Sequence, residues 1–425
     1  MTPAARSALD RLTDPRLLRR NVIISLLGWV LPAATALVAF PLLAQRLGPD
    51  RFGVVALAWS VVGWFSLFDF GIARGLTRLI ASRAAASRDE DIPALVWSAS
   101  VVLLAIGVVI GATIWILAPM LVTRALHVPE PLVPEVTLAV RWLGLSIPGV
   151  VHATALRGVL EARQQFLRAT LLRIPLGVAT YALPLLAPDA AQAVALIVLA
   201  RTLYWLGTWA ALGALARPVR PTAIGELWTE GGWITLSTII SPFLVQGDRF
   251  ALALLLPIAA SGWYAASIEV ATKMWLFTAA LQPVFYSAVS AAYALDRPRA
   301  RALMRQAVLV TFAALLLPTL ALAVFAEPGL RWWMKDAFSI EGAQALPWLA
   351  MAVFANCLAQ VPYSYLQAGG GARAVALLHV AELPLFALAL WLLVPRYGVL
   401  GAAAVWCLRM ALDAVGMWRI SARLG

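Results

Sequence analysis

Long apolar stretches separated by short polar connections dominate this 425-residue chain. Each stretch is about as long as the roughly 20 mostly apolar residues that a membrane-spanning helix needs. Within lipid, only helices and closed barrels satisfy every backbone polar group, and runs this long and apolar are not barrel strands. The sequence therefore predicts an all-α integral membrane protein of about twelve transmembrane helices, at residues 21–46, 52–78, 92–118, 133–157, 168–187, 192–215, 231–256, 262–288, 306–327, 344–366, 375–394 and 399–419.

The composition excludes several other classes of protein. The chain is 62% hydrophobic and 13% charged, whereas a soluble domain is about half apolar and a quarter charged. Its net charge is +12, but the basic residues lie between the apolar stretches and not in one water-facing cluster, so we expect no nucleic-acid partner. Residues 1–20 carry Asp10, Asp14 and several arginines without an apolar core, so they are not a cleavable signal peptide.

The distribution of basic residues predicts the orientation in the membrane. With the N-terminus inside the cell, 21 of the 33 Lys and Arg residues fall in cytoplasmic segments and 6 in outer loops. Cytoplasmic loops of membrane proteins carry this excess of Lys and Arg. We therefore expect a multi-pass protein of the bacterial inner membrane with both termini in the cytoplasm.

The two halves of the chain resemble each other. A shift of about 209 residues places residues 47–56 over residues 256–265, and Arg201 falls near Arg409. An even number of helices per half makes the repeats parallel, as in transporters that rock two lobes around a central site. We expect a cytoplasmic segment at residues 1–20, an N-terminal lobe at 21–220 and a C-terminal lobe at 221–425, each lobe with six helices beside a central cavity.

Ionisable residues inside predicted helices are the candidates for function. A charge at the bilayer centre is costly and generally faces a cavity or a partner. Surplus arginine suits an anionic substrate, because the guanidinium fork matches phosphate oxygens. Glu269 and Lys273 are four residues apart and can pair, as can Arg409 and Asp413. The candidate substrate-binding residues are Arg249, Asp248, Lys273, Glu269, Arg141 and Arg201, and the candidates for H⁺ or Na⁺ coupling are Asp248 and Glu269.

Enzymatic chemistry finds little support in the sequence. We find no Gly-rich phosphate loop followed by Lys-Ser/Thr, and no cluster of His, Asp or Glu with metal-ligand spacing. Cys357 and Cys407 lie in apolar stretches and read as free thiols. The longest outer loops, residues 119–132 and 328–343, are too short for a catalytic domain. We therefore expect a transporter without a cofactor and without a metal site.

Three segments resemble a known family. Residues 41–53 (PLLAQRLGPDRFG) resemble its first helix and the turn that follows. Residues 68–78 resemble its second helix, where an Asp-x-Gly step at Asp69 precedes a basic end. Asp248-Arg249, followed by Gly262-Trp263-Tyr264, resembles helices seven and eight. The family is the polysaccharide biosynthesis proteins, the oligosaccharide flippases of the multidrug/oligosaccharidyl-lipid/polysaccharide (MOP) exporter superfamily.

The resemblance implies a function and a set of partners. It implies flipping of a polyprenyl-diphosphate-linked oligosaccharide by alternating access, for a surface polymer such as O-antigen, capsule or exopolysaccharide. It also implies a monomer among membrane lipids, beside a polysaccharide polymerase and a chain-length regulator, with a cytoplasmic gate at Asp69, Arg74 and Arg78. Two alternatives stay open: a multidrug or metabolite exporter of the same superfamily, and a membrane polysaccharide polymerase or glycosyltransferase.

Overall fold

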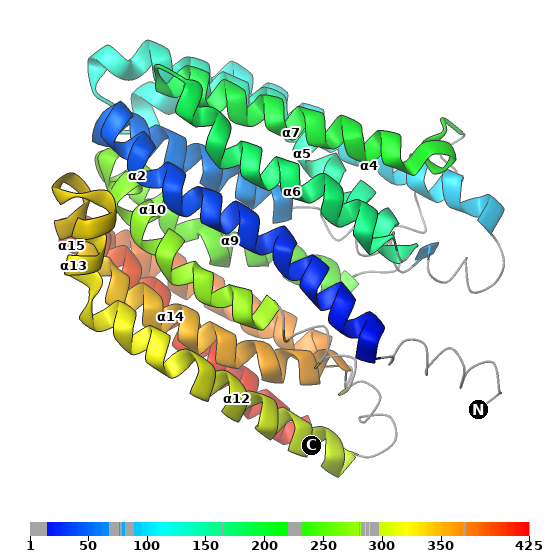
Figure 1. The fold of residues 1–425 in the computed structure, drawn as a ribbon. Helices are drawn as coiled ribbons and strands as arrows, with labels where there is room; N and C mark the ends of the chain where they lie inside the picture. Colours follow the sequence, from blue (N-terminus) through cyan, green and yellow to red (C-terminus); the bar gives the residue numbers. More distant parts are fainter. Residues whose placement is uncertain are drawn as a thin grey trace.

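The computed structural model describes residues 15–67, 76, 79–80, 89–163, 165–219, 232–279, 281, 285, 289, 297–368 and 371–424. These residues are almost entirely helical (Figure 1). The predicted all-α architecture is therefore confirmed. The helices are α2 (Pro15–Leu67), α4 (Ile92–Met120), α5 (Val133–Ala162), α6 (Phe166–Ala182), α7 (Ala190–Leu212), α9 (Gly232–Leu255), α10 (Ala259–Ala271), α12 (Arg297–Val324), α13 (Ala326–Met334), α14 (Asp336–Ala368) and α15 (Ala372–Leu424).

Two of these helices contain a break at a glycine. Gly48 has φ 76° inside α2, and Gly398 has φ 59° inside α15. Glycine adopts this left-handed region without the steric penalty that a Cβ brings. The breaks fall between predicted helices 21–46 and 52–78, and between 375–394 and 399–419. Each long helix is thus two membrane-crossing helices joined by a tight turn.

The helices are long enough to cross a bilayer. Among the described residues, 8 helical stretches have the length and hydropathy of membrane spans. Two of these stretches contain a glycine break, so each of them corresponds to two of the predicted helices. The predicted helices at 231–256 and 262–288 correspond to α9 and α10. Together they account for the twelve predicted helices, although α2 begins at Pro15, earlier than expected.

The helices pack as two lobes with α2 at the seam (Figure 1). In the N-terminal lobe, α5 packs on α4 and α7, and α6 packs on α2 and α7. In the C-terminal lobe, α15 packs on α9 and α14, and α14 also packs on α10, α12 and α13. Contacts between the lobes run from α2 to α9, α10 and α13. The boundary at residue 220 lies outside the described residues, so the predicted lobe limits stay a prediction.

Small residues bring helices of the N-terminal lobe into close contact. A Cβ at Gly111 of α4 would lie 2.4 Å from the carbonyl oxygen of Gly144 on α5. A Cβ at Gly177 of α6 would lie 2.2 Å from Cγ of Pro32 on α2. Membrane helices associate through such close backbone packing, because lipid offers no hydrophobic drive between them. These contacts hold α4 close against α5, and α6 close against α2.

Helix α2, which is broken at Gly48, turns back at the end of the bundle opposite the end where it begins and where α15 ends (Figure 1). The two lobes are in contact near this turn. We call this contact the seal. A Cβ at Gly53 would lie 2.3 Å from the carbonyl oxygen of Ile258 in the other lobe. The backbone N–H of Ile258 donates to the carbonyl of His127 at 3.2 Å. Backbone from both lobes is therefore in direct contact at this end.

The seal also includes α13, an element that the sequence analysis treated as part of a loop. Leu330 and Met334 are buried on one side of α13, while Trp332 on the other side is 87% exposed. This one-sided burial explains why the short segment is helical. Trp333 of α13 reaches across to α2, where its indole N–H donates to the carbonyl of Leu37. The predicted gate residues Asp69, Arg74 and Arg78 lie outside the described residues.

Candidate functional site

A cavity of about 740 Å³ lies between the two lobes; we call it the chamber. A smaller cavity of about 200 Å³ adjoins it; we call it the recess. The two cavities share six lining residues, so they form one continuous space. These shared residues are Gly63, Thr180, Tyr181, Arg201, Arg249 and Glu269.

The lining of the chamber is cationic. Five basic residues line it, and Glu269 is the one acid among the described lining residues. Field lines of one sign concentrate in a cleft with low-dielectric walls, so this lining attracts anions. The basic residues are Arg157, Arg173, Arg201, Arg249 and Lys273.

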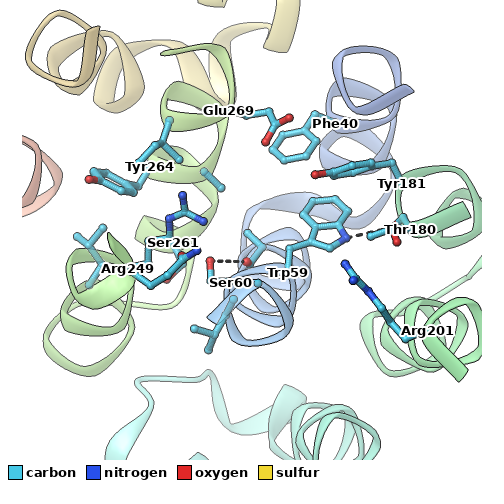
Figure 2. Close-up of a pocket in the computed structure, with 17 residues that line it drawn as sticks. Phe40, Trp59, Ser60, Thr180, Tyr181, Arg201, Arg249, Ser261, Tyr264 and Glu269 are labelled. Atoms are coloured by element: carbon cyan, nitrogen blue, oxygen red, sulfur yellow. Dashed lines mark hydrogen bonds between the residues drawn. The ribbon is translucent and has the colours of Figure 1, made fainter. Parts of the chain in front are cut away.

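Arg201 on α7 and Arg249 on α9 face the space from opposite lobes (Figure 2). In the described part of the chain, neither guanidinium forms an ion pair, and the Nε atom of each is buried without a hydrogen-bond acceptor. Both side chains are partly exposed to the cavity, so a bound anion can supply the charge and the acceptors that these guanidinium groups lack. The two arginines are therefore positioned to hold one anion between the lobes.

Glu269 and Lys273 on α10 form the ion pair expected from their spacing. Their side chains are 15% and 25% exposed, so the pair is in contact with the chamber. Glu269 also interacts electrostatically with Tyr181, as do Arg201 and Arg249. The one acid in the described part of the lining is thus largely neutralised by Lys273 of its own helix, and the positive surplus remains.

Asp248 lies next to Arg249 but does not line the chamber or the recess. It is fully buried and accepts a hydrogen bond from the Tyr264 hydroxyl. Adjacent residues on a helix point about 100° apart, so Arg249 faces the cavity while Asp248 faces into the C-terminal lobe. Tyr264 connects the two environments, because its ring lines the recess.

Arg141 on α5 is placed away from the other candidates. Its guanidinium carbon lies 5.9 Å from the centroid of the Trp115 ring on α4. Such a cation–π contact partly compensates a desolvated arginine. Arg141 is absent from the lining of both cavities.

Arg409, the counterpart of Arg201 in the repeat, has the opposite environment. It lies 3.9 Å from a carboxylate oxygen of Glu382 and 4.0 Å from one of Asp413, and it donates to the carbonyl of Leu244 at 3.1 Å. His379 lies 3.5 Å from Asp413 in the same cluster. The charge of Arg409 is compensated by carboxylates within the C-terminal lobe, and Arg201 is the member of the repeated pair that faces the cavity.

The recess is capped by aromatic rings (Figure 2). Phe40 stacks on Trp59 with a centroid separation of 4.7 Å and an interplanar angle of 11°. The Trp59 indole donates to the carbonyl of Thr180 at 3.2 Å. That carbonyl has no donor four residues later, because Pro184 lacks an N–H. The carbonyl of Thr180 is therefore free to accept the hydrogen bond from Trp59, and this bond fixes the position of the cap.

Polar side chains from the C-terminal lobe complete the recess. Gln246 and Ser261 line it, and each is 7% exposed. The Oε1 atom of Gln246 and the Oγ atom of Ser261 have no hydrogen-bond partner among the described residues. The recess therefore offers unsatisfied neutral polar groups next to the cationic chamber.

Several lining residues were not singled out in the sequence. Arg157 and Arg173 line the chamber but are not among the candidates drawn from the sequence. Helical spacing was the signal that could have found them. Arg157 follows other lining residues of α5 at intervals of three and four, namely Val150, Ala153 and Thr154, and Arg173 precedes Leu176, Gly177, Thr180 and Tyr181 on α6 in the same way.

Comparison with known proteins gives one family model and one curated relative that each match most of the chain. Residues 18–293 match the family model described as polysaccharide biosynthesis protein. A Shigella flexneri protein described as a putative O-antigen transporter is 26% identical over 409 residues, which is 93% of this chain and 96% of that protein.

Solved structures share the fold. A multidrug resistance MATE family transporter of the MOP superfamily, solved in an inward-facing conformation, has a TM-score of 0.77 at 15% identity, covering 93% of this chain and 98% of its own. A MOP superfamily transporter from Pyrococcus furiosus, described as having a binding pocket of reverse polarity, has a TM-score of 0.63 at 15% identity, covering 96% of this chain and 95% of its own. The arrangement of two helical lobes around a central site is therefore the MOP superfamily fold.

Proposed function

The chain belongs to the polysaccharide biosynthesis protein family, and on that premise we propose that it is a flippase for a polyprenyl-diphosphate-linked oligosaccharide. The observation that carries the proposal is the pair Arg201 and Arg249, which face one cavity from opposite lobes and form no ion pair with any other residue that the structure describes. A diphosphate presents the charge and the oxygen acceptors that two guanidinium groups lack.

The head group explains why a flippase needs such a cavity. Sugar hydroxyls and a diphosphate lose their hydration in hydrocarbon, at several kcal/mol for each unsatisfied polar group and more for each charge. The cationic lining replaces the solvation of the diphosphate, and the polar residues replace that of the sugar. The polyprenyl tail stays in the bilayer throughout, since it is as apolar as the lipid.

The position of the seal supports alternating access as part of the proposal. With both termini in the cytoplasm, the chamber loads from the cytoplasmic side while α13, Gly53 and Ile258 close the outer side. An anion held by Arg201 and Arg249 draws the lobes together from both sides of the chamber. Separation of the lobes at the seal then releases the head group to the outer face of the inner membrane.

The energy source of the cycle is part of the same proposal. Asp248 and Glu269 are the candidates for H⁺ or Na⁺ coupling, since one is buried behind the recess and the other lines the chamber. No cofactor takes part. The polymerase and the chain-length regulator act after flipping, and one copy of the chain contains the whole site.

The fold also fits a second function, export of a drug or metabolite, because MATE family transporters share it. An exporter of organic cations needs a cavity in which acids predominate. Among the residues that the structure describes, the lining has five basic residues and one acid that is itself ion-paired. The charge of the chamber therefore favours an anionic substrate.

Deletion of the gene, followed by extraction and mass spectrometry of the lipids, tests the proposal. We expect surface polysaccharide to disappear and a polyprenyl-diphosphate oligosaccharide to accumulate on the cytoplasmic face. The wild-type gene should restore export, and Arg249→Ala should not, although the variant is present in the membrane. Unchanged lipids with altered sensitivity to organic cations would favour the exporter, and lipid accumulated on the outer face would indicate a block after flipping.

A further inference from the structure

We propose that the recess binds the first sugar ring of the substrate through Gln246 and Ser261, while the diphosphate stays between Arg201 and Arg249. This inference rests on the proposed flippase function and divides its site into two parts. The chamber binds the charged diphosphate, and the recess binds one neutral sugar ring that carries hydroxyl groups.

The buried polar atoms of Gln246 and Ser261 carry the inference. Both residues line the recess, and each is only 7% exposed. One oxygen atom of each side chain has no hydrogen-bond partner among the described residues. Buried polar groups in stable proteins are almost always hydrogen-bonded. A ring with several hydroxyl groups can donate to both oxygens at once, because each hydroxyl is a donor and an acceptor.

The aromatic side chains supply the second type of contact. Trp59 and Tyr181 line the recess beside the polar groups and are partly exposed to it. The face of an aromatic ring carries partial negative charge, which attracts the weakly positive C–H groups on the flat side of a sugar ring. Sites that bind small molecules combine such apolar walls with a few placed polar groups. The recess has both, whereas a site for a lipid tail would have only the first.

The size of the recess sets how much of the substrate it holds. Its volume of about 200 Å³ is below the roughly 300–1,000 Å³ of pockets for drug-sized ligands, so it holds one ring. The chamber, at about 740 Å³, has room for the remaining sugars.

The position of Gln246 indicates which ring that is. Gln246 and Arg249 are three residues apart on the same face of α9, a rise of about 4.5 Å. Arg249 also lines both cavities. A group bound at Gln246 is therefore the one directly attached to a diphosphate bound at Arg249. That group is the first sugar and not the far end of the oligosaccharide.

Gly63 of the opposite lobe makes room for the Gln246 side chain. A Cβ at position 63 would lie 3.3 Å from the Gln246 Nε2 atom, closer than ordinary contact. Gly63→Ala therefore perturbs the subsite from the other lobe without removing any polar group. It provides an independent variant beside Gln246→Ala and Ser261→Ala.

Binding of two short lipids to the purified protein in nanodiscs tests the inference. The probes are polyprenyl diphosphate alone, and the same lipid carrying one hexose or one N-acetylhexosamine. We expect one of the sugar-bearing lipids to bind wild-type protein several-fold more tightly than the bare lipid. Gln246→Ala and Ser261→Ala should each lower the affinity for that lipid by about 3- to 10-fold, which corresponds to the loss of one neutral hydrogen bond. Neither substitution should change the affinity for the bare lipid.

Two controls separate this inference from the proposed function. Ser146→Ala removes a buried hydroxyl that bonds its own helix away from the recess, and should change neither affinity. Arg249→Ala should weaken the binding of both lipids. The sugar subsite is overturned if the sugar adds no affinity in the wild-type protein, or if the recess variants weaken binding of both lipids equally. Either result leaves the proposed flippase function intact. If neither lipid binds wild-type protein, both proposals fail.

Discussion

At the scale of single residues, the site depends on which arginines lack a partner. Arg201 and Arg409 occupy corresponding positions of the repeat, yet Arg409 lies between two carboxylates and Arg201 faces the chamber. Five of the six predicted substrate-binding residues lie in or directly behind the cavity, and Arg141 lies on Trp115 instead. A charge pattern in the sequence cannot separate these cases, because partners on other helices decide them.

We expect Arg201→Ala and Arg249→Ala to weaken binding of polyprenyl diphosphate by about 10- to 100-fold each, since each removes hydrogen bonds to a charged ligand. Lys at either position should recover only part of the loss, because an ammonium group lacks the planar fork of a guanidinium. Arg141→Ala is the matched control, as its arginine lies outside the cavity. An equal loss of affinity in all three variants would mean that binding depends on the overall positive charge of the protein and not on these two positions.

Glu269→Gln should act in the opposite direction. The change removes the negative charge that neutralises Lys273 and leaves the shape of the side chain nearly unaltered. The chamber becomes more positive, so affinity for polyprenyl diphosphate should rise by a few-fold at low salt and less at high salt. Titration of the purified variant at two salt concentrations measures this. Weaker binding would indicate that Glu269 contacts the ligand directly.

The sequence predicted the charged residues of the site better than the neutral ones. Arg249, Glu269 and Lys273 are conspicuous in apolar helices, because a membrane-embedded charge is rare. Gln246 and Ser261 gave no such signal, since a single polar residue in a membrane helix commonly bonds its own backbone. Only the packing of α9 against α2 and α10 shows that their oxygen atoms are buried and unpartnered.

At the scale of helices, prolines and tryptophans act together. Pro41 lacks an N–H, so the carbonyl of Leu37 has no helical donor, and Trp333 of the other lobe donates to it. Pro184 leaves the carbonyl of Thr180 free in the same way, and Trp59 donates to it. The first of these bonds joins the two lobes at the seal, and the second positions the cap of the recess.

Trp333→Phe should weaken the seal, because it removes the indole donor and keeps an aromatic ring beside Phe40. We expect faster labelling from outside the cell of a cysteine introduced at Ser60, in a background lacking Cys357 and Cys407. Pro41→Ala restores a backbone donor to Leu37, so Trp333→Phe should have a smaller effect in that background. Additive effects of the two substitutions would show that the indole does not act through this carbonyl.

The elements themselves were predicted well except at the seal. The helix limits followed from apolar length, and the turns at Gly48 and Gly398 fell where polar connections were expected. Helix α13 was missed because it has only 9 residues and lies in a connection. Short amphipathic segments give a weak signal in a sequence, and the contact with α2 is what makes α13 part of the lobe interface.

At the scale of the whole molecule, the seal and the chamber lie at different depths between the same two lobes. At the seal, Gly53 lies directly against the backbone of Ile258. A conformational change that opens this end must separate those two segments. The sequence repeat predicted two lobes, but it could not predict at which end they touch, since both ends are compatible with the same helices.

Gly53→Ala should therefore destabilise the sealed arrangement. Its Cβ would lie 2.3 Å from the Ile258 carbonyl oxygen, so backbone must move. We expect increased labelling of the same Ser60→Cys reporter from outside the cell. Gly329→Ala is the control, because a Cβ there has nothing within 4 Å. Unchanged labelling in Gly53→Ala would place the barrier to the outside elsewhere than at Gly53 and Ile258.

The most direct test of the account is flipping in proteoliposomes that contain only this chain and a labelled polyprenyl-diphosphate oligosaccharide. An impermeant enzyme or quencher added outside reports how much labelled lipid has reached the outer leaflet. The account predicts transfer that requires both Arg201 and Arg249 and is unaffected by Arg141→Ala. Transfer of organic cations without any movement of the labelled lipid would contradict it and identify the chain as an exporter.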